Sequence, residues 1–324
     1  MSMKQTIRAA GLTVLAWTTL CPVSLRADQT KAYSALMHGR VAEATDLLRE
    51  ALAANDSDAR AHLLLCRAAY AQEISDRAVS ECERAAQLAP NDSETQMWFG
   101  RALGQKASRV NPLTAYGLAK RVRVAFERSF QLDPSNLAAA SDLGEYYVGA
   151  PSFLGGGPEK LQGLAARLMP SSPAKAHRLL ALLAEKNKDT VKAEAEFKAA
   201  VAAGKTAEAY NDLALFYQDN HRPDEAAAAA KQAIAVDRQN GPAHVDASSI
   251  LMAADRSPET AEAALRSYLG SANQSDSAPA FKVHVQLGRL LAKRGDAAGA
   301  HAEYVAALQL APEYESARKV LGRA

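Results

Sequence analysis

The sequence predicts an all-α protein built from a repeated unit. One arrangement of small and large apolar residues recurs along the 324-residue chain. It is found in residues 59–92, 174–207, 207–240 and 281–314. Proline and asparagine stand at a unit boundary, as in Pro90-Asn91, where they end one helix and begin the next. No segment alternates apolar and polar residues as a half-buried strand does.

The clearest copy lies at residues 281–314. Its skeleton is Leu287-Gly288, Leu291, Ala300, Tyr304, Ala307 and Pro312. Residues 59–92 carry Leu65-Cys66, Ala69, Ala78, Cys82, Ala85 and Pro90 at the same spacing. This pattern closely resembles the tetratricopeptide repeat, a helix–turn–helix unit of about 34 residues. The resemblance implies a right-handed α-solenoid of about eight repeats, in a family that mostly binds other molecules rather than transforming them.

The first 27 residues have the composition of a secretory signal peptide. Lys4 and Arg8 precede an apolar run over residues 9–20, and Ala27 ends a short segment of small and polar residues. We expect cleavage near Ala27 and a periplasmic or secreted mature chain. An uncleaved anchor remains an alternative, although the run is shorter than the roughly 20 residues of a spanning helix.

The charge balance excludes a general electrostatic attraction to nucleic acid. Removal of Lys4, Arg8 and Arg26 with the leader leaves 35 basic and 36 acidic residues of the original 38 and 36. No later segment is apolar enough to span a membrane. The alanine-rich composition suits a bacterial envelope protein.

Residues 28–148 are predicted to form an N-terminal block of three repeats and the start of a fourth. The third repeat is longer than the family spacing, and the extra residues are approximately 105–117. This insertion predicts either a longer loop or an extended second helix.

Residues 149–173 form an irregular junction. The segment Ala150 to Pro158 is rich in Gly and Pro, and a helix is expected at about 159–169. We expect a protruding loop, with Gly155 to Gly157 acting as a hinge before a helix that begins at Pro158. Binding of an anion at that helix N-terminus is an alternative.

Residues 174–324 are predicted to form a C-terminal block. Repeats 174–207 and 207–240 are regular, whereas residues 241–275 are degenerate and end in a polar run over 271–277. Repeat 281–314 follows, and residues 315–324 are expected to form a capping helix.

The repeat alignment places Cys66 on a first helix and Cys82 on the second helix of the same unit. Such helices are antiparallel neighbours, and export favours oxidation. The sequence therefore allows either a disulfide or two small buried thiols.

Histidines recur at one position of the first helix. They are His62, His177, His244 and His284. Because successive copies are separated by about 10 Å or more, they are too far apart to share a metal ion. We interpret them as structural. No catalytic motif, metal site or cofactor site is predicted, and the chain is not expected to be an enzyme.

The resemblance implies a ligand-binding groove along the first helices. The candidate residues are Arg60, Leu63, Arg67, Tyr70, Met97, Arg101 and Glu145. Arg67 and Arg101 are equivalent and should stack, and these positions are expected to be exposed. Arginine beside aromatic residues suits an acidic or peptide ligand. The alternative is that they are ordinary solvated residues.

The densest basic run is Lys120 to Arg123, with Arg109 and Arg128 nearby. A solvated helix face is the simplest interpretation. An anionic lipid headgroup or an acidic partner is the alternative.

These observations favour a non-enzymatic interaction scaffold of the bacterial cell envelope that binds a peptide or protein segment in its concave groove. The alternative is a periplasmic protein that binds a small molecule, using the superhelix interior and the 150–158 loop.

Overall fold

The computed structural model describes residues 23–322, with side chains from Gln29 onward. Most of the predicted leader, residues 1–22, lies outside the described residues. The described part contains seventeen α-helices and one 3-10 helix, and it has no strand. The predicted all-α repeat solenoid is therefore confirmed.

Helices α1 to α16 form eight antiparallel pairs. The first helices of the pairs are α1 (Val23–Met37), α3 (Ala59–Ala71), α5 (Ser93–Ala107), α7 (Leu137–Gly149), α9 (Pro173–Lys186), α11 (Ala207–Asp219), α13 (Ala243–Ala253) and α15 (Ala280–Lys293). The second helices are α2 (Val41–Ala54), α4 (Ser75–Leu88), α6 (Pro112–Leu132), α8 (Pro158–Leu168), α10 (Thr190–Gly204), α12 (Pro223–Val236), α14 (Pro258–Leu269) and α16 (Ala297–Leu310). The 3-10 helix η1 (Ser152–Leu154) precedes α8, and α17 (Glu315–Leu321) follows the last pair.

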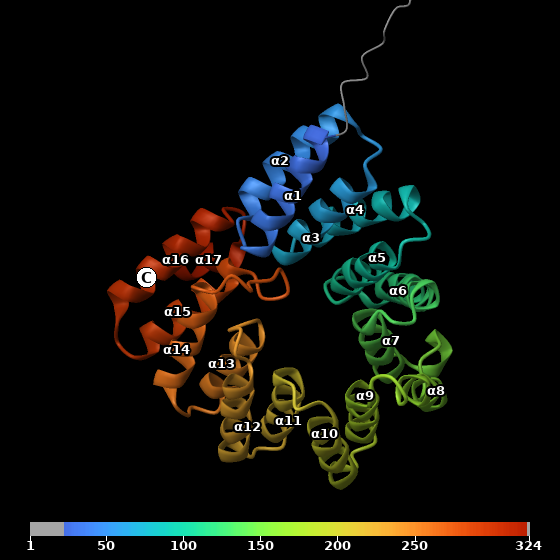
Figure 1. Ribbon diagram of the computed structural model, residues 1–324, viewed down its shortest axis with the longest axis vertical. Helices are drawn as coiled ribbons and strands as arrows, with labels where there is room; N and C mark the ends of the chain where they lie inside the picture. Colours follow the sequence, from blue (N-terminus) through green and yellow to red (C-terminus); the bar gives the residue numbers. More distant parts are fainter. Residues whose placement is uncertain (1–22, 323–324) are drawn as a thin grey trace, which may run out of the picture.

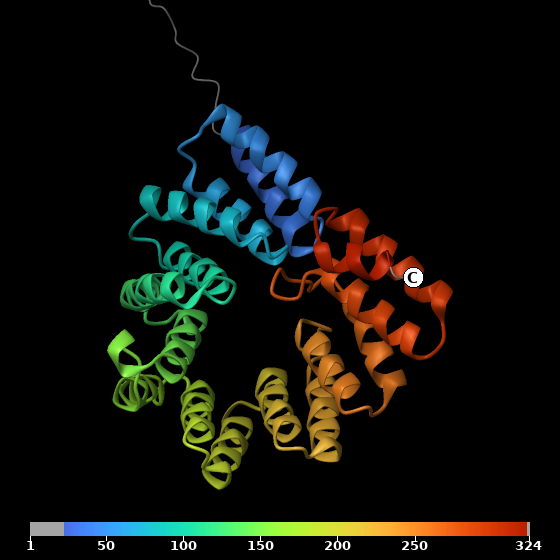
Figure 2. The same ribbon diagram turned by 180° about the vertical axis from the view of Figure 1, so that it is seen from behind.

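The pairs are arranged in a ring, with the first helix of each pair on the inner side and the second on the outer side (Figure 1, Figure 2). Local sequence explains where many of these helices begin. Asp58, Asp92 and Asn136 each accept a hydrogen bond from the backbone N–H three residues later, which caps α3, α5 and α7. Proline occupies the first turn of other helices, such as Pro173 in α9 and Pro223 in α12.

Small residues let the two helices of a pair approach closely. A Cβ atom on Gly100 would lie 2.5 Å from the ring of Phe126, and one on Gly288 would lie 2.4 Å from the ring of Tyr304. Glycine is therefore required at these positions of α5 and α15, because a larger side chain would push the second helix away.

Histidine also joins the two helices of a pair. The Nδ1 atoms of His62, His177 and His284 lie 2.6 to 2.7 Å from a glutamate oxygen on the second helix. In each case the glutamate, Glu81, Glu196 or Glu303, follows the histidine by 19 residues. Each histidine thus has its own carboxylate partner within its repeat.

A disulfide joins α3 to α4 in the structure. Cys66 and Cys82 are both fully buried, and their Cα atoms are 5.1 Å apart. The bond closes a loop with a sequence separation of 16. It therefore restricts the unfolded chain over a short segment.

Replacing both cysteines by alanine is expected to lower the free energy of unfolding by about 3 kcal/mol, because the unfolded chain regains the entropy of that loop. Urea denaturation of parent and variant, both without reductant, measures the difference. Equal midpoints for the two proteins would show that no disulfide forms in the native chain.

The extra residues of the third repeat lengthen the second helix rather than form a long loop. Helix α6 begins at Pro112 and follows α5 after a short turn. The junction after α7 is compact: Gly157 N–H donates to Tyr147 O (2.9 Å), and Tyr146 Oη donates to Leu154 O (2.9 Å). Only part of this junction protrudes, and Phe153 is its most exposed large side chain.

The two ends of the solenoid meet. Both ribbon views show α1 and α3 beside the segment that carries α15 to α17 (Figure 1, Figure 2). A Cβ atom on Gly39 would lie 2.7 Å from the backbone nitrogen of Ala280, so the chain at the two ends is in direct contact. Lys282 Nζ lies 2.8 Å from Glu73 Oε1, which adds an ion pair between them.

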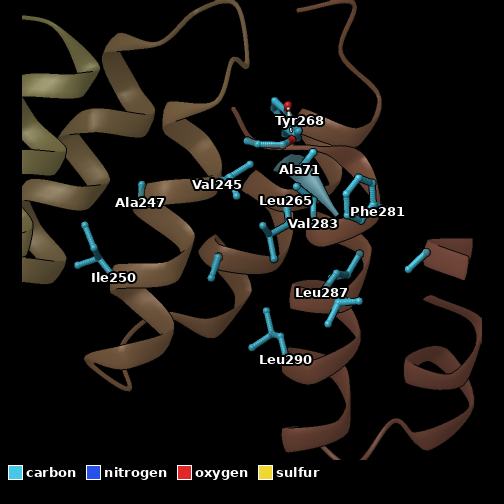
Figure 3. Close-up of a cluster of buried hydrophobic side chains, with 14 of the residues drawn as sticks. Ala71, Val245, Ala247, Ile250, Leu265, Tyr268, Phe281, Val283, Leu287 and Leu290 are labelled. Atoms are coloured by element: carbon cyan, nitrogen blue, oxygen red, sulfur yellow. Dashed lines mark hydrogen bonds between the residues drawn. The ribbon is translucent and has the colours of Figure 1, made fainter. Parts of the chain in front are cut away.

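A continuous apolar core crosses this junction. Ala71 of α3 belongs to the same buried cluster as Tyr268, Phe281 and Val283, and Figure 3 shows it among them. Because apolar burial is the main stabilising contribution in such a fold, the ring closes by packing as well as by ion pairs. Within residues 23–322, no helix combines the length and apolar character needed to cross a membrane.

Candidate functional site

The inner side of the N-terminal repeats carries an ion-pair network centred on Arg67. Its Nε lies 2.7 Å from Asp276 Oδ2, and its Nη1 lies 2.7 Å from Glu94 Oε1. Arg60 reaches the second oxygen of Glu94 at 2.7 Å. Burial disfavours the charged form of Arg67, but the hydrogen bond and charge of Asp276 together with the charges of Glu94 and Tyr33 raise its pKa above the ordinary value. Arg67 therefore carries its charge inside the protein.

Trp98 links the two equivalent arginines. The guanidinium carbons of Arg67 and Arg101 lie 4.9 and 4.8 Å from its ring centroid. Tyr70 contacts the same tryptophan edge-on, with centroids 5.5 Å apart. Arg101 also pairs with Asp142 of α7, at 2.6 Å. The expected stacking of the arginines is thus achieved through a shared aromatic ring.

The network of paired charges continues into the next repeats. Arg178 of α9 donates from Nη2 to Glu145 at 2.8 Å and from Nε to Asp212 at 3.0 Å. Neighbouring first helices are therefore joined by arginine–carboxylate pairs from α5 to α11. Such pairs fix the register of adjacent repeats.

Asp276 belongs to the segment between α14 and α15, which the fully buried Tyr268 holds in place. Tyr268 Oη donates to Ala278 O (2.7 Å) and accepts from the backbone N–H of Ser275 (2.9 Å). Its carbon atoms pack in the core that crosses the ring junction. Tyr268 thus positions the carboxylate that meets Arg67.

The predicted groove residues divide into two groups. Leu63, Arg67 and Met97 are buried, and Arg67 is only 6% exposed, so the expectation that they are exposed is wrong. Arg67 is covered by the segment between α14 and α15, which the closed ring brings over α3, whereas Leu63 and Met97 pack in a core cluster that runs from α3 to α9. The others reach solvent: Arg60, Tyr70 and Arg101 are partly exposed, and Glu145 is exposed.

The arginines of the predicted site are already neutralised. Arg60 and Arg67 pair with Glu94, and Arg101 pairs with Asp142. An acidic ligand would have to displace a carboxylate of the chain itself. The geometry therefore does not favour an acidic ligand at these arginines.

Among the described residues, the C-terminal half of the inner side has two buried hydrogen-bond acceptors without a donor and one buried donor, Arg178 Nη1, without an acceptor. Asn211 Oδ1 and Gln218 Oε1 of α11 are buried, and neither has a hydrogen-bond partner among the described residues. Burial and the nearby carboxylates of Asp219 and Asp212 raise the pKa of Glu185. A ligand that supplies N–H donors or positive charge would satisfy the two acceptors and Glu185.

Asp246 is part of the same acidic region. Its side chain reaches solvent, but the helices around it displace much of the bulk water, and Asp212 and Glu208 lie nearby. Together these effects raise the pKa of Asp246 to about 6.

This shift predicts a pH-dependent stability. A raised folded-state pKa contributes stability that is present below about pH 4 and lost as the pH rises through about 6. Asp246→Asn should therefore gain stability relative to the parent between these values, by less than about 1 kcal/mol because water screens an exposed group. Urea midpoints measured across this range test the prediction.

Asp255→Asn is a matched control, because the pKa of Asp255 is shifted in the opposite direction from that of Asp246. The hydrogen bond from Lys293 lowers the pKa of Asp255 below its ordinary value of 3.8, so its contribution to stability is present above about pH 4 and is lost only at lower pH. Between about pH 4 and 6, the difference in stability between the parent and Asp255→Asn should therefore stay nearly constant. If the stability of the parent and that of Asp246→Asn depended on pH in the same way, the raised pKa of Asp246 would be contradicted.

The 150–158 loop does not cover the inner side. Its 3-10 helix packs on the outer helix α6, where Phe153 stacks on Tyr116 with ring centroids 6.2 Å apart. Gly155 has a φ of +86°, a left-handed backbone conformation that favours glycine. The alternative prediction that this loop and the superhelix interior together bind a small molecule is therefore wrong in its placement of the loop.

Sequence reasoning did not assign Trp98, Asp142, Asp276 or Tyr268 to the site. Trp98 is adjacent to a predicted groove residue, so its position was a usable signal. Asp276 and Tyr268 come from the degenerate seventh repeat and carry no recognisable signal. Within residues 23–322, no three His, Cys, Asp or Glu side chains are grouped as metal ligands.

Comparisons with known proteins agree with this fold. Residues 30–93 match the family model of the tetratricopeptide repeat. Yeast Tom70 has a TM-score of 0.53 at 15% identity, with coverage of 98% of this chain and 67% of that chain. A thermophilic TPR protein of Thermus thermophilus, TTC0263, has a TM-score of 0.47 at 18% identity, covering 70% of this chain and 99% of that chain.

PilW, a widely conserved type IV pilus biogenesis factor, has a TM-score of 0.49 at 15% identity, covering 66% of this chain and 94% of that chain. No curated protein matches the sequence. The fold defines an all-α helical repeat protein. The predicted resemblance is confirmed for residues 30–93, which match the tetratricopeptide repeat, and the described chain as a whole has the fold of a helical repeat protein.

Proposed function

We propose that this protein is a non-enzymatic interaction scaffold of the bacterial cell envelope, exported by its leader and cleaved near Ala27. It binds a peptide or protein segment along the inner side of its first helices. Repeat folds of this kind present extended binding surfaces formed by successive units. A general protein-binding role follows from that architecture.

The observation that carries the proposal is Leu215 of α11. It occupies the repeat position equivalent to Arg67 and Arg101, yet it is 47% exposed. Two side-chain oxygens that have no hydrogen-bond donor within residues 23–322, Asn211 Oδ1 and Gln218 Oε1, belong to residues four positions before and three positions after Leu215. An exposed apolar side chain among unsatisfied acceptors suits a segment with apolar and basic side chains.

The proposed contact surface therefore extends from the exposed predicted residues to the C-terminal half. Arg60, Tyr70, Arg101 and Glu145 form one end, and Leu215 forms the other. Leu63, Arg67 and Met97 support this surface from within and do not reach the ligand while the ring is closed.

Site-specific photo-crosslinking in the cells that make the protein tests this function. A benzophenone amino acid is placed at Leu215 and, as a control, at Val191, which is 83% exposed on the outer helix α10. We expect an adduct with one defined polypeptide from position 215 and none from position 191. Absence of an adduct at 215, or equal adducts at both positions, would contradict the proposal.

A further inference from the structure

The two irregular segments of the chain meet on the outer side of the ring and form one exposed apolar surface. Tyr116 comes from the start of α6, and Phe153 comes from the loop after α7. Their rings stack at 6.2 Å with an interplanar angle of 24°. Neither the third nor the fourth repeat would present these side chains at the regular repeat length.

This surface, here called the outer patch, consists of Leu113, Tyr116, Val124 and Phe153. Leu113 is 85% exposed and Phe153 is 71% exposed, so both side chains project into solvent. Tyr116, Lys120 and Val124 follow one another at intervals of four residues and therefore share one face of α6. A hollow of about 250 Å³ beside Val124, lined by Phe99 and Ala125, extends the apolar surface.

The outer patch carries positive charge. Lys120 Nζ lies 4.3 Å from the centroid of Tyr116, and no carboxylate partner for it is present within residues 23–322. Helix α6 has four basic residues and one acidic residue, but Arg121 pairs with Glu83 of α4, so Lys120 is the cation that the outer patch presents. That acid, Glu127, accepts a hydrogen bond from Tyr147 and lies 3.5 Å from Lys160 Nζ. The acid is therefore engaged by α7 and α8.

We propose that the outer patch docks the protein onto an anionic lipid bilayer. Leu113 and Phe153 enter the boundary between headgroups and acyl chains, and Lys120 stays at the level of the lipid phosphates. Projecting aliphatic and aromatic side chains with a flanking cation are the features that hold a peripheral helix in this boundary. This inference does not depend on a partner at the inner side.

The shape of the surface favours a bilayer over an acidic protein segment. An acidic segment would pair with cations but would leave the two most exposed apolar side chains in water. Projecting side chains lower their free energy by entering an apolar phase, and anionic headgroups add attraction to each cation near the surface.

Vesicle co-sedimentation of the full chain tests the proposal. The vesicles contain phosphatidylcholine alone or equal parts of phosphatidylcholine and phosphatidylglycerol. The variants are Leu113→Ser/Phe153→Ser and Lys120→Gln, and Val191→Ser is the control, since Val191 is equally exposed on α10. All proteins share the same N-terminal apolar run, so differences between them report the outer patch.

We expect the parent and Val191→Ser to bind anionic vesicles equally and more tightly than neutral ones. Leu113→Ser/Phe153→Ser should weaken binding to anionic vesicles by more than about tenfold, because two apolar side chains no longer enter the bilayer. Lys120→Gln should weaken it by about fivefold. Circular dichroism should show unchanged helix content in every variant, because all substituted side chains are exposed.

Two results would overturn the proposal. One is binding to anionic vesicles that is equal for the parent and Leu113→Ser/Phe153→Ser. The other is that the protein is retained on immobilised poly-L-glutamate in a way that requires Lys120 but not Leu113 or Phe153, while it binds anionic vesicles no more tightly than neutral ones. The second result would identify an acidic protein segment as the ligand.

Discussion

Replacing Asp276 by Ala is expected to lower the free energy of unfolding by about 3 kcal/mol and to open the ring. The substitution leaves the buried guanidinium of Arg67 without its partner at Nε. Loss of one partner from a buried ion pair costs about 3 to 5 kcal/mol, and the low end applies because Glu94 still pairs with Arg67. Urea denaturation measures the stability, and small-angle X-ray scattering measures the radius of gyration.

Asp255→Asn is the control, because Asp255 has a φ of +53°, which asparagine tolerates. It also removes an aspartate that pairs with a cation at 2.7 Å, but both Asp255 and Lys293 are largely exposed. Exposed pairs contribute less than about 1 kcal/mol, so this variant should change neither the urea midpoint by much nor the radius of gyration. An equal loss of stability in both variants, with an unchanged radius for Asp276→Ala, would refute the role of Asp276 in ring closure.

Replacing Tyr268 by Ala is expected to destabilise the protein by about 3 to 5 kcal/mol, because a fully buried aromatic side chain is removed from the core that crosses the junction. Tyr268→Phe should cost less, about 1 to 3 kcal/mol, because only the hydroxyl is lost. Ser275 N–H and Ala278 O then lack their partner. Urea denaturation of the two variants measures both values.

A double-mutant cycle separates the two roles of Tyr268. If its hydroxyl positions Asp276, Tyr268→Phe and Asp276→Ala should be non-additive by at least about 0.5 kcal/mol, since both loosen the same contact with Arg67. The effects of Tyr268→Phe and Asp255→Asn on the free energy of unfolding should be additive. Additivity in both cycles would mean that the tyrosine stabilises the core without positioning the aspartate.

The predicted site shows which properties of a residue the repeat alignment can predict. The alignment placed Arg67 and Arg101 at equivalent positions, and the structure brings both onto Trp98. Their exposure could not be derived in the same way. The burial of Arg67 depends on Asp276, which is 209 residues away in the chain, and on the curvature that brings the two ends together, whereas Arg101 pairs with Asp142 and stays partly exposed.

The histidines illustrate a signal that was present but incompletely used. Their recurrence correctly indicated a structural role, whereas the glutamate 19 residues after three of them was not recognised as the partner. Both members of each pair lie within one repeat, so this contact is local enough for sequence spacing to indicate. Contacts between distant repeats leave no comparable periodic signal.

The sequence by itself determined the helices, their pairing and the repeat architecture. These features depend on residues within one unit, such as Gly288 against Tyr304 or Asp58 at the start of α3. Only the tertiary structure decided that the ring closes, which inner residues are buried, and that Phe153 meets Tyr116 on the outer side. Small rotations between successive repeats accumulate along a solenoid, and their sum brings distant segments into contact.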